Sequence, residues 1–115
     1  MKRVHWIGSS RNDLRDLPDA IQDEVGFALY EAQKGRKPGN AKPLKGFKGA
    51  GVLEIVEGHD GGTYRAVYTV RLASAIYVLH VFQKKSKHGV ATPKADIDLI
   101  KQRLKMAEDI EKGST

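Results

Sequence analysis

Apolar residues recur at helical spacing in two parts of the chain. Between residues 17 and 32 they fall every three or four positions, which predicts an amphipathic helix with one buried stripe. Pro18 suits the first turn of this helix and Gly35 is well placed to end it. A shorter helix, capped by Ser9 or Ser10, is expected to run through Leu17. A third helix is expected to begin at Thr92-Pro93, with residues 111–115 as a flexible tail. Its predicted inner face comprises Ile97, Ile100, Leu104 and Ala107.

Runs of apolar and β-branched residues predict strands at residues 2–7, 52–57, 64–72 and 76–83. The sequence GHDGG at residues 58–62 has the turn residues of a hairpin, and residues 73–75 form a second short turn. Sequential strands joined by tight turns favour an antiparallel meander. We therefore predict an α+β fold of order β-α-α-β-β-β-α, with a twisted antiparallel sheet of about four strands and helices covering one face. Residues 36–51 are predicted to form a long loop.

Length and composition are typical of one globular domain, residues 1–115. The absence of cysteine excludes disulfides and thiolate metal sites, and the four histidines are scattered without ligand spacing, so no metal or other cofactor is predicted. The N-terminal residues do not resemble a signal peptide, and no window approaches the roughly 20 apolar residues of a membrane helix. A soluble, cytoplasmic protein is expected.

The positive charge of the chain is concentrated in two stretches. Twenty basic residues against fourteen acidic ones give a net charge of +6. Residues 34–48 contain six basic residues and no acidic one, and residues 83–94 contain four lysines, one histidine and no acid. This asymmetry indicates a polyanionic partner, most commonly nucleic acid, although a merely solvated basic surface has the same composition.

The two central strands are expected to bring basic groups together. Arg65 lies early in residues 64–72, and Lys84, Lys85, Lys87 and His88 follow the end of residues 76–83. Because antiparallel neighbours place the start of one strand beside the end of the next, these groups should meet at one end of the sheet. The simpler interpretation is that Arg65 pairs with an acid such as Glu54 or Glu57 and that the lysines only protect a strand edge.

A cluster of cations without a metal supports one reaction class, the cleavage of RNA by its own 2′-hydroxyl. Such an enzyme aligns the attack, moves protons and stabilises negative charge on phosphorus. Arginine and lysine supply the charge stabilisation, a lysine among other cations can transfer a proton, and His88 is the proton carrier near pH 7. No Gly-rich phosphate loop, H-E-x-x-H or G-x-S-x-G motif is present.

Four blocks in order, K-P-L-K-G, Y-R-x-x-Y, F-x-K-K and T-P-x-x-x-I, resemble the phage-derived, HigB-type branch of the RelE/ParE toxin superfamily. The resemblance implies a small RelE-like fold and a toxin of a type II toxin–antitoxin pair, encoded beside a HigA-like helix-turn-helix antitoxin. It also implies a metal-independent endonuclease that cuts mRNA on the ribosome. The strand arginine of that family matches Arg65, and its basic residues after the following strand match Lys84 and Lys85, while His88 alone stands where many relatives have a late proton-transfer residue.

The candidate site residues follow from these two lines of reasoning. The predicted catalytic residues are Arg65, Lys84, Lys85 and His88. The predicted RNA-binding residues are Arg36, Lys37, Lys45, Lys48 and Lys87. Two other functions share the same fold or charge: a ParE-like toxin that binds DNA gyrase without chemistry, and a phage-derived nucleic-acid-binding accessory protein.

Overall fold

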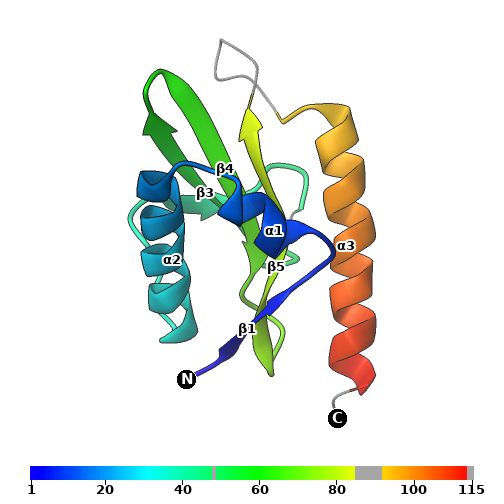
Figure 1. Cartoon of the computed structure of the whole chain (residues 1–115). Coiled ribbons are helices and arrows are strands. Elements are labelled where there is room, and N and C mark those ends of the chain that lie inside the picture. Colours follow the sequence, from blue (N-terminus) through cyan, green and yellow to red (C-terminus); the bar gives the residue numbers. More distant parts are fainter. Residues whose placement is uncertain (48, 85–91, 114–115) are drawn as a thin grey trace.

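The computed structural model describes residues 1–47, 49–84 and 92–113. Within these ranges, five strands form one sheet in the order β1-β5-β4-β3-β2 (Figure 1). The elements in chain order are β1 (Arg3–Trp6), α1 (Ser10–Arg15), α2 (Asp19–Gln33), β2 (Ala41–Pro43), β3 (Val52–His59), β4 (Gly62–Thr69), β5 (Ala75–Lys84) and α3 (Lys94–Gly113).

The predicted α+β class and the antiparallel β3-β4-β5 meander are confirmed. The hairpin between β3 and β4 turns at Asp60 and Gly61, whose φ angles of 47° and 80° are the left-handed pair that a tight two-residue hairpin turn requires. The first strand joins this sheet as predicted, but the sheet is not antiparallel throughout, because β1 runs parallel to β5. A hairpin imposes antiparallel pairing, whereas β1 leads into two helices, and such a crossover permits a parallel neighbour.

A short additional strand lies within the predicted loop. β2 pairs with β3 through Ala41 opposite Ile55 and Pro43 opposite Leu53. Three residues are too few for an alternating pattern to be visible in the sequence, and Pro43 is tolerated because β2 is an edge strand. The sheet therefore has one strand more than the four predicted.

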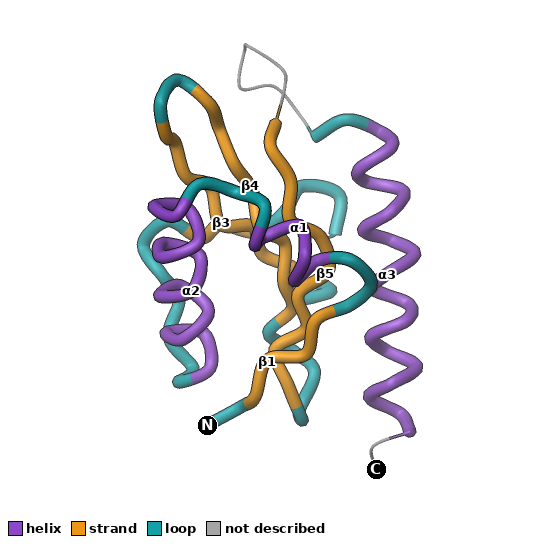
Figure 2. Tube along the Cα trace, viewed as in Figure 1, coloured by secondary structure: helices purple, strands orange, loops and turns teal. Residues whose placement is uncertain are grey.

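The helices cover both faces of the sheet, and the prediction of one covered face was wrong. α2 and α3 lie on opposite faces, with the strands between them (Figure 2). α1 is on the same face as α2, because its Leu14 belongs to the core cluster beneath α2. The reason is visible in β5, where Ile76 and Val78 pack toward α2 while Tyr77 and Leu79 pack toward α3. A strand buried on both faces reads as a near-continuous apolar run, and residues 76–82 are apolar except for His80.

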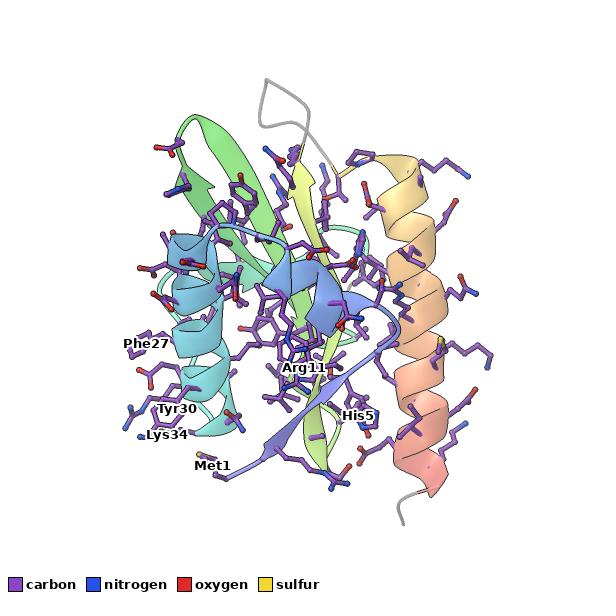
Figure 3. All side chains as sticks on the ribbon, in the orientation of Figure 1. Met1, His5, Arg11, Phe27, Tyr30 and Lys34 are labelled. Atoms are coloured by element: carbon purple, nitrogen blue, oxygen red, sulfur yellow. The ribbon has the colours of Figure 1, made fainter. Side chains whose placement is uncertain are left out.

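The predicted helix faces are confirmed. In α2, the buried residues are Ile21, Val25, Ala28, Leu29 and Ala32. In α3, Ile100 and Ala107 are buried, and Ile97 and Leu104 pack against the same core. α3 continues to Gly113, so Glu111 is helical and not part of a flexible tail as predicted. The outer side of α2 carries two exposed aromatic side chains, Phe27 and Tyr30 (Figure 3).

A β-bulge changes which residues of β5 face α3. Val67 pairs with His80 and Tyr68 pairs with Val78, so Leu79 is an extra residue on β5. Leu79 packs in the core against α3, and His80 bonds to Asp96 of α3. Leu79 and His80 therefore both face α3, although consecutive residues of a regular strand face opposite sides. A bulge interrupts the alternation in this way. Beyond the bulge it is the even-numbered residues of β5 that face α3.

Candidate functional site

Arg65 and Lys84 lie on the same face of the sheet. The register pairs Arg65 with Phe82 and Thr63 with Lys84, so the arginine and the lysine are diagonal neighbours on adjacent strands. Diagonal neighbours of an antiparallel pair have Cα atoms about 7–8 Å apart, within reach of long side chains. The expected meeting of Arg65 with Lys84 therefore occurs, on the face that α3 covers.

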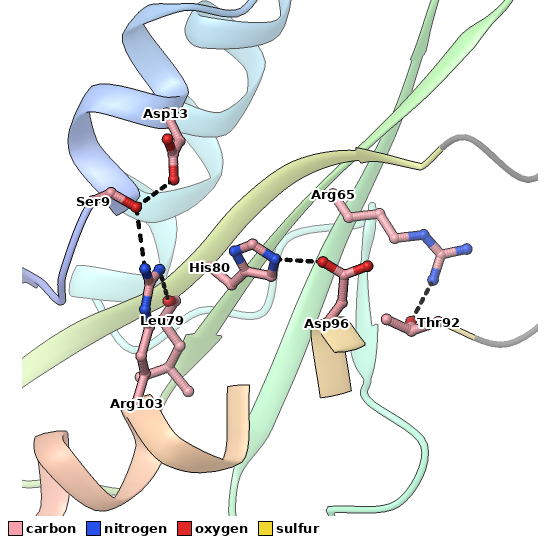
Figure 4. A network of polar contacts seen from close by, with 8 residues as sticks. All are labelled: Ser9, Asp13, Arg65, Leu79, His80, Thr92, Asp96 and Arg103. Carbon is pink, nitrogen blue, oxygen red and sulfur yellow. Dashed lines mark hydrogen bonds and ion pairs between the residues drawn. The ribbon is translucent and has the colours of Figure 1, made fainter. Parts of the chain in front are cut away.

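Arg65 is buried and held by two neighbours. Its Nη1 donates to Glu54 Oε2 at 2.8 Å, which joins β4 to β3. The same Nη1 donates to Thr92 Oγ1 at 3.4 Å, which joins β4 to the residues before α3 (Figure 4). The side chains of Arg65 and Glu54 are 8% and 5% exposed. Arg65 Nε is also buried and has no hydrogen-bond partner among the described residues. The guanidinium is thus fixed on one side by a carboxylate and has an unused donor on another.

Lys84 ends β5 as a buried lysine, with 4% of the residue exposed. Burial lowers the pKa of its ammonium, and the charges of Arg65 and Lys42 lower that pKa further, while Glu54 opposes them. A lysine whose charged form is disfavoured by burial and by neighbouring cations is one of the signs of a functional site. We refer to Glu54, Arg65, Lys84 and Thr92 as the Arg65 cluster.

Two charged residues of this region, Glu54 and Lys42, are not among the site residues that the sequence predicts. The sequence indicates Glu54 only as a structural partner of Arg65, whereas in the structure it is the anion of the Arg65 cluster. Lys42 on β2 is exposed, and its Nζ lies 3.7 Å from Glu54 Oε1. No pattern marks β2 as a strand, so nothing in the sequence places Lys42 beside Glu54.

His80 lies on the same face, on the other diagonal from Arg65. Its Nε2 and Asp96 Oδ1 are 2.7 Å apart (Figure 4). Its ring stacks on that of Phe82, with centroids 4.4 Å apart. His80 Nδ1 is buried without a partner in the described part of the chain. The sequence predicts a satisfied or partly exposed histidine within an apolar strand. In the structure His80 is buried, with one hydrogen-bonded nitrogen and one nitrogen without a partner among the described residues.

Of the remaining predicted residues, the three that the structure describes, Arg36, Lys37 and Lys45, are not part of the Arg65 cluster. Arg36 and Lys37 follow α2 and line a cavity with Val70 and Ile76, at the other end of the central strands. Lys45 is exposed in the loop after β2. The others lie outside the described residues, namely Lys48, Lys85, Lys87 and His88.

Neither a metal-ligand cluster nor a membrane span is found in the described ranges. No three or more histidine, aspartate or glutamate side chains there are grouped as metal ligands would be. Among the helices described, none combines the length and apolar character needed to cross a bilayer.

Comparison with known proteins identifies the family. Residues 12–105 match the model of the family described as phage derived protein Gp49-like (DUF891). A chain in the crystal structure of the toxin–antitoxin complex RelBE2 from Mycobacterium tuberculosis is similar, with a TM-score of 0.49, 24% sequence identity, and coverage of 72% of this chain and 98% of that chain. No curated protein matches significantly. Since the family match spans most of the chain, the protein belongs to the phage-derived Gp49-like family, a RelE/HigB-type toxin family of toxin–antitoxin systems.

Proposed function

We propose that this protein is a metal-independent mRNA endonuclease that acts on translating ribosomes and is silenced by a HigA-like helix-turn-helix antitoxin. The observation that carries the proposal is the placement of Arg65 and Lys84 on one face of adjacent strands, both almost fully buried. The proposal is supported equally by the family, because the resemblance to RelE/HigB-type toxins implies an mRNA endonuclease.

The reaction is an internal transfer at phosphorus. The ribose 2′-oxygen attacks the neighbouring phosphorus, the bond from phosphorus to the 5′-oxygen breaks, and the products are a 2′,3′-cyclic phosphate and a 5′-hydroxyl. Arg65 stabilises the negative charge that develops on the phosphoryl oxygens. Glu54 holds Arg65 Nη1 in place, so phosphate contacts fall to its other donors, including the unpartnered Nε. Because Arg65 is buried, the groups that cover it must move before a phosphate reaches it.

Lys84 is the proton acceptor in this scheme. Its lowered pKa gives a larger fraction of neutral amine near pH 7 than an exposed lysine has, and a neutral amine can take the 2′-hydroxyl proton. His88 would donate a proton to the leaving 5′-oxygen, and Lys85 would add charge stabilisation. Lys45, Lys48 and Lys87 would contact RNA phosphates. Arg36 and Lys37, at the other end of the sheet, have no part in this scheme.

Conservative variants test the scheme without removing buried volume. Arg65→Lys and Lys84→Met are expected to lower cleavage by about 10²–10³-fold, the loss typical when one transition-state contact is removed. Lys101→Met, an exposed position on α3, is the control and should cleave like the wild type. The measurements are primer extension on mRNA after brief induction, and cleavage of a synthetic mRNA on purified ribosomes.

The chemistry of the ends gives an independent readout. The scheme requires 5′-hydroxyl ends that cannot be ligated until they are phosphorylated. If the Arg65→Lys and Lys84→Met proteins fold and cleave at the wild-type rate, the proposed catalytic site is refuted. If the wild-type protein arrests growth while mRNA stays intact, the proposed nuclease function is refuted.

A ParE-like gyrase-binding toxin is the second candidate. It is favoured by one observation: Arg65 is already occupied by Glu54 and only 7% of the residue is exposed, as expected of a purely structural arginine. In that case induced cells would show DNA damage and filamentation with intact mRNA, and Lys84→Met would remain toxic.

A further inference from the structure

A cavity of about 760 Å³ lies between the carboxyl end of α2 and the first residues of the chain. Its apolar wall comprises Ala32 of α2, Leu53 of β3, Ile76 of β5 and Val70, which follows β4. Apolar atoms arranged as an open concave surface are typical of a site that accepts apolar side chains from a ligand.

The rim of this cavity is basic. Lys2, Lys34, Arg36 and Lys37 line it, and the described lining residues include no acid. Two of these charges have partners within the chain. Lys2 Nζ donates to the carbonyl oxygens of Val70 and Leu72, and Arg36 pairs with Glu31 at 3.0 Å. Lys34 and Lys37 are exposed and give the rim its available positive charge.

The exposed aromatic side chains of α2 extend the same surface. Phe27 and Tyr30 are 64% and 43% exposed, and they lie on the same side of α2 as Lys34, which follows the helix (Figure 3). Lys34 also lines the cavity, so the two aromatic side chains adjoin it. Lys34 Nζ lies 4.3 Å from the centroid of the Tyr30 ring. Large exposed apolar side chains that adjoin a concave apolar site commonly mark a protein-binding surface.

We propose that this surface, formed by Phe27, Tyr30, Lys34, Lys37 and the cavity, binds an acidic amphipathic segment of the antitoxin. Apolar side chains of the segment enter the cavity, its carboxylates meet Lys34 and Lys37, and its remaining apolar face covers Phe27 and Tyr30. RNA would match the two lysines but would leave the apolar wall unused. The proposal rests on the proposed function for the existence of an antitoxin.

The surface is remote from the Arg65 cluster. Ile76, in the cavity, and Lys84 are eight residues apart on β5, which corresponds to about 26 Å along a strand. Variants at the surface should therefore weaken antitoxin binding without changing RNA cleavage, and the two functions can be measured separately.

The test is a pair of charge reversals matched in number and exposure. Lys34→Glu/Lys37→Glu alters the rim, and Lys101→Glu/Lys105→Glu makes the same charge change on exposed positions of α3. The probes are the protein encoded by the adjoining gene and overlapping peptides of about 15 residues tiled across it, long enough for an amphipathic helix. The rim variant should bind at least about tenfold more weakly and the α3 variant should bind like the wild type. Phe27→Ala should also weaken binding.

Other results overturn the proposal in distinguishable ways. Equal losses in the two charge variants would show only a general charge effect. Loss of affinity for a short RNA, with binding to the encoded protein unchanged, would make the rim a nucleic-acid contact. A dimer that Phe27→Ala dissociates would make the occupant a second copy of this chain. If the wild type does not bind the encoded protein, both this proposal and the antitoxin assignment fail, while mRNA cleavage, measured separately, still decides the enzymatic function.

Discussion

Arg65 and Glu54 form a buried ion pair between two central strands, with Nη1 and Oε2 2.8 Å apart. The pair is diagonal in the sheet, because Arg65 lies opposite Val56 and Glu54 lies opposite Val67. Glu54 is also 3.7 Å from the Lys42 ammonium, and its charge raises the pKa of Lys84. The Glu54 carboxylate thus offsets the mutual repulsion of the three cations Arg65, Lys42 and Lys84. Glu54 therefore affects both the stability of the fold and the charge of the candidate site.

Replacing Glu54 by glutamine tests whether its charge stabilises the folded chain. Glu54→Gln keeps the shape and one acceptor but removes the charge that balances the buried guanidinium. We expect the free energy of unfolding to fall by roughly 1–3 kcal/mol, as for a buried charged group that loses a charged hydrogen-bond partner. Urea unfolding at neutral pH measures the change. Glu24→Gln, exposed on α2, is the matched control and should lie within about 0.5 kcal/mol of the wild type. Equal stabilities for the two variants would show that the pair contributes nothing net.

Lys84 should make stability depend on pH in the alkaline range. Its pKa is lower in the folded chain than the ordinary 10.5, because burial and Arg65 disfavour the ammonium. Between the lowered pKa and 10.5 the unfolded chain binds more protons than the folded chain, so stability contributed by this residue rises with pH. The difference in unfolding free energy, wild type minus Lys84→Met, should increase through this window, by at most about 1.4 kcal/mol per pH unit.

Denaturant unfolding of both proteins at several alkaline pH values measures this slope. Lys101→Met, which removes an exposed lysine, should give curves parallel to those of the wild type. A constant difference between wild type and Lys84→Met would mean that the lysine titrates alike in the folded and unfolded chain.

Much of the fold could be predicted because its signals are local. The apolar stripe from Ile21 to Ala32 and the hairpin turn at Asp60 and Gly61 depend on residue spacing and on conformational preference within a few positions. The covered faces could not be predicted in the same way. A near-continuous apolar run such as residues 76–82 indicates burial but does not show whether helices pack on one face or on both.

The candidate site was predictable only in part for a similar reason. Strand order and antiparallel pairing bring Arg65 near Lys84, but simple alternation from Tyr77 would turn Lys84 to the opposite face. The bulge at Leu79 shifts the alternation by one residue, so that Lys84 lies on the same face as Arg65. No glycine or proline near Leu79 predicts this bulge from the sequence. Thr92 joins the cluster through a contact across 27 sequence positions, which spacing does not reveal.

Tyr68 carries a polar atom that the fold leaves unused. Its hydroxyl is buried, has no hydrogen-bond partner among the described residues, and burial raises the pKa of the phenol to about 12. Tyr68→Phe removes that atom and keeps the ring, so the free energy of unfolding should rise by about 1 kcal/mol. Tyr77→Phe is the matched comparison, because the Tyr77 hydroxyl donates to Glu111 Oε1 at 2.9 Å, and its loss should lower stability by about 1 kcal/mol. Thermal and urea unfolding measure the stability of both variants. If both substitutions change stability in the same direction, the assignment of an unpaired Tyr68 hydroxyl and a paired Tyr77 hydroxyl is contradicted.

Glu111 connects the end of α3 to the turn before β5. Its carboxylate accepts hydrogen bonds from the Ser74 hydroxyl at 2.6 Å, the Ser74 amide at 3.0 Å and the Tyr77 hydroxyl at 2.9 Å. The Ser74 hydroxyl and then Tyr77 favour the ionised form, and they hold the pKa of Glu111 below its ordinary 4.5. The folded chain therefore binds fewer protons than the unfolded chain near that value, so the stabilisation is complete above pH 4.5 and is lost as pH falls through the lowered pKa.

Glu111→Gln should accordingly lower the Tm at neutral pH and flatten the acid side of the stability profile. Glutamine retains an acceptor oxygen for Ser74 but has no charge to be neutralised, so the difference from the wild type should shrink as the wild-type carboxylate is protonated. Glu108→Gln, exposed on the same helix, should leave both the Tm and its pH dependence unchanged. Thermal unfolding followed by circular dichroism at closely spaced acidic pH values measures both quantities. A Glu111→Gln protein whose difference from the wild type is the same at every pH would show that the three hydrogen bonds do not depend on the charge of Glu111.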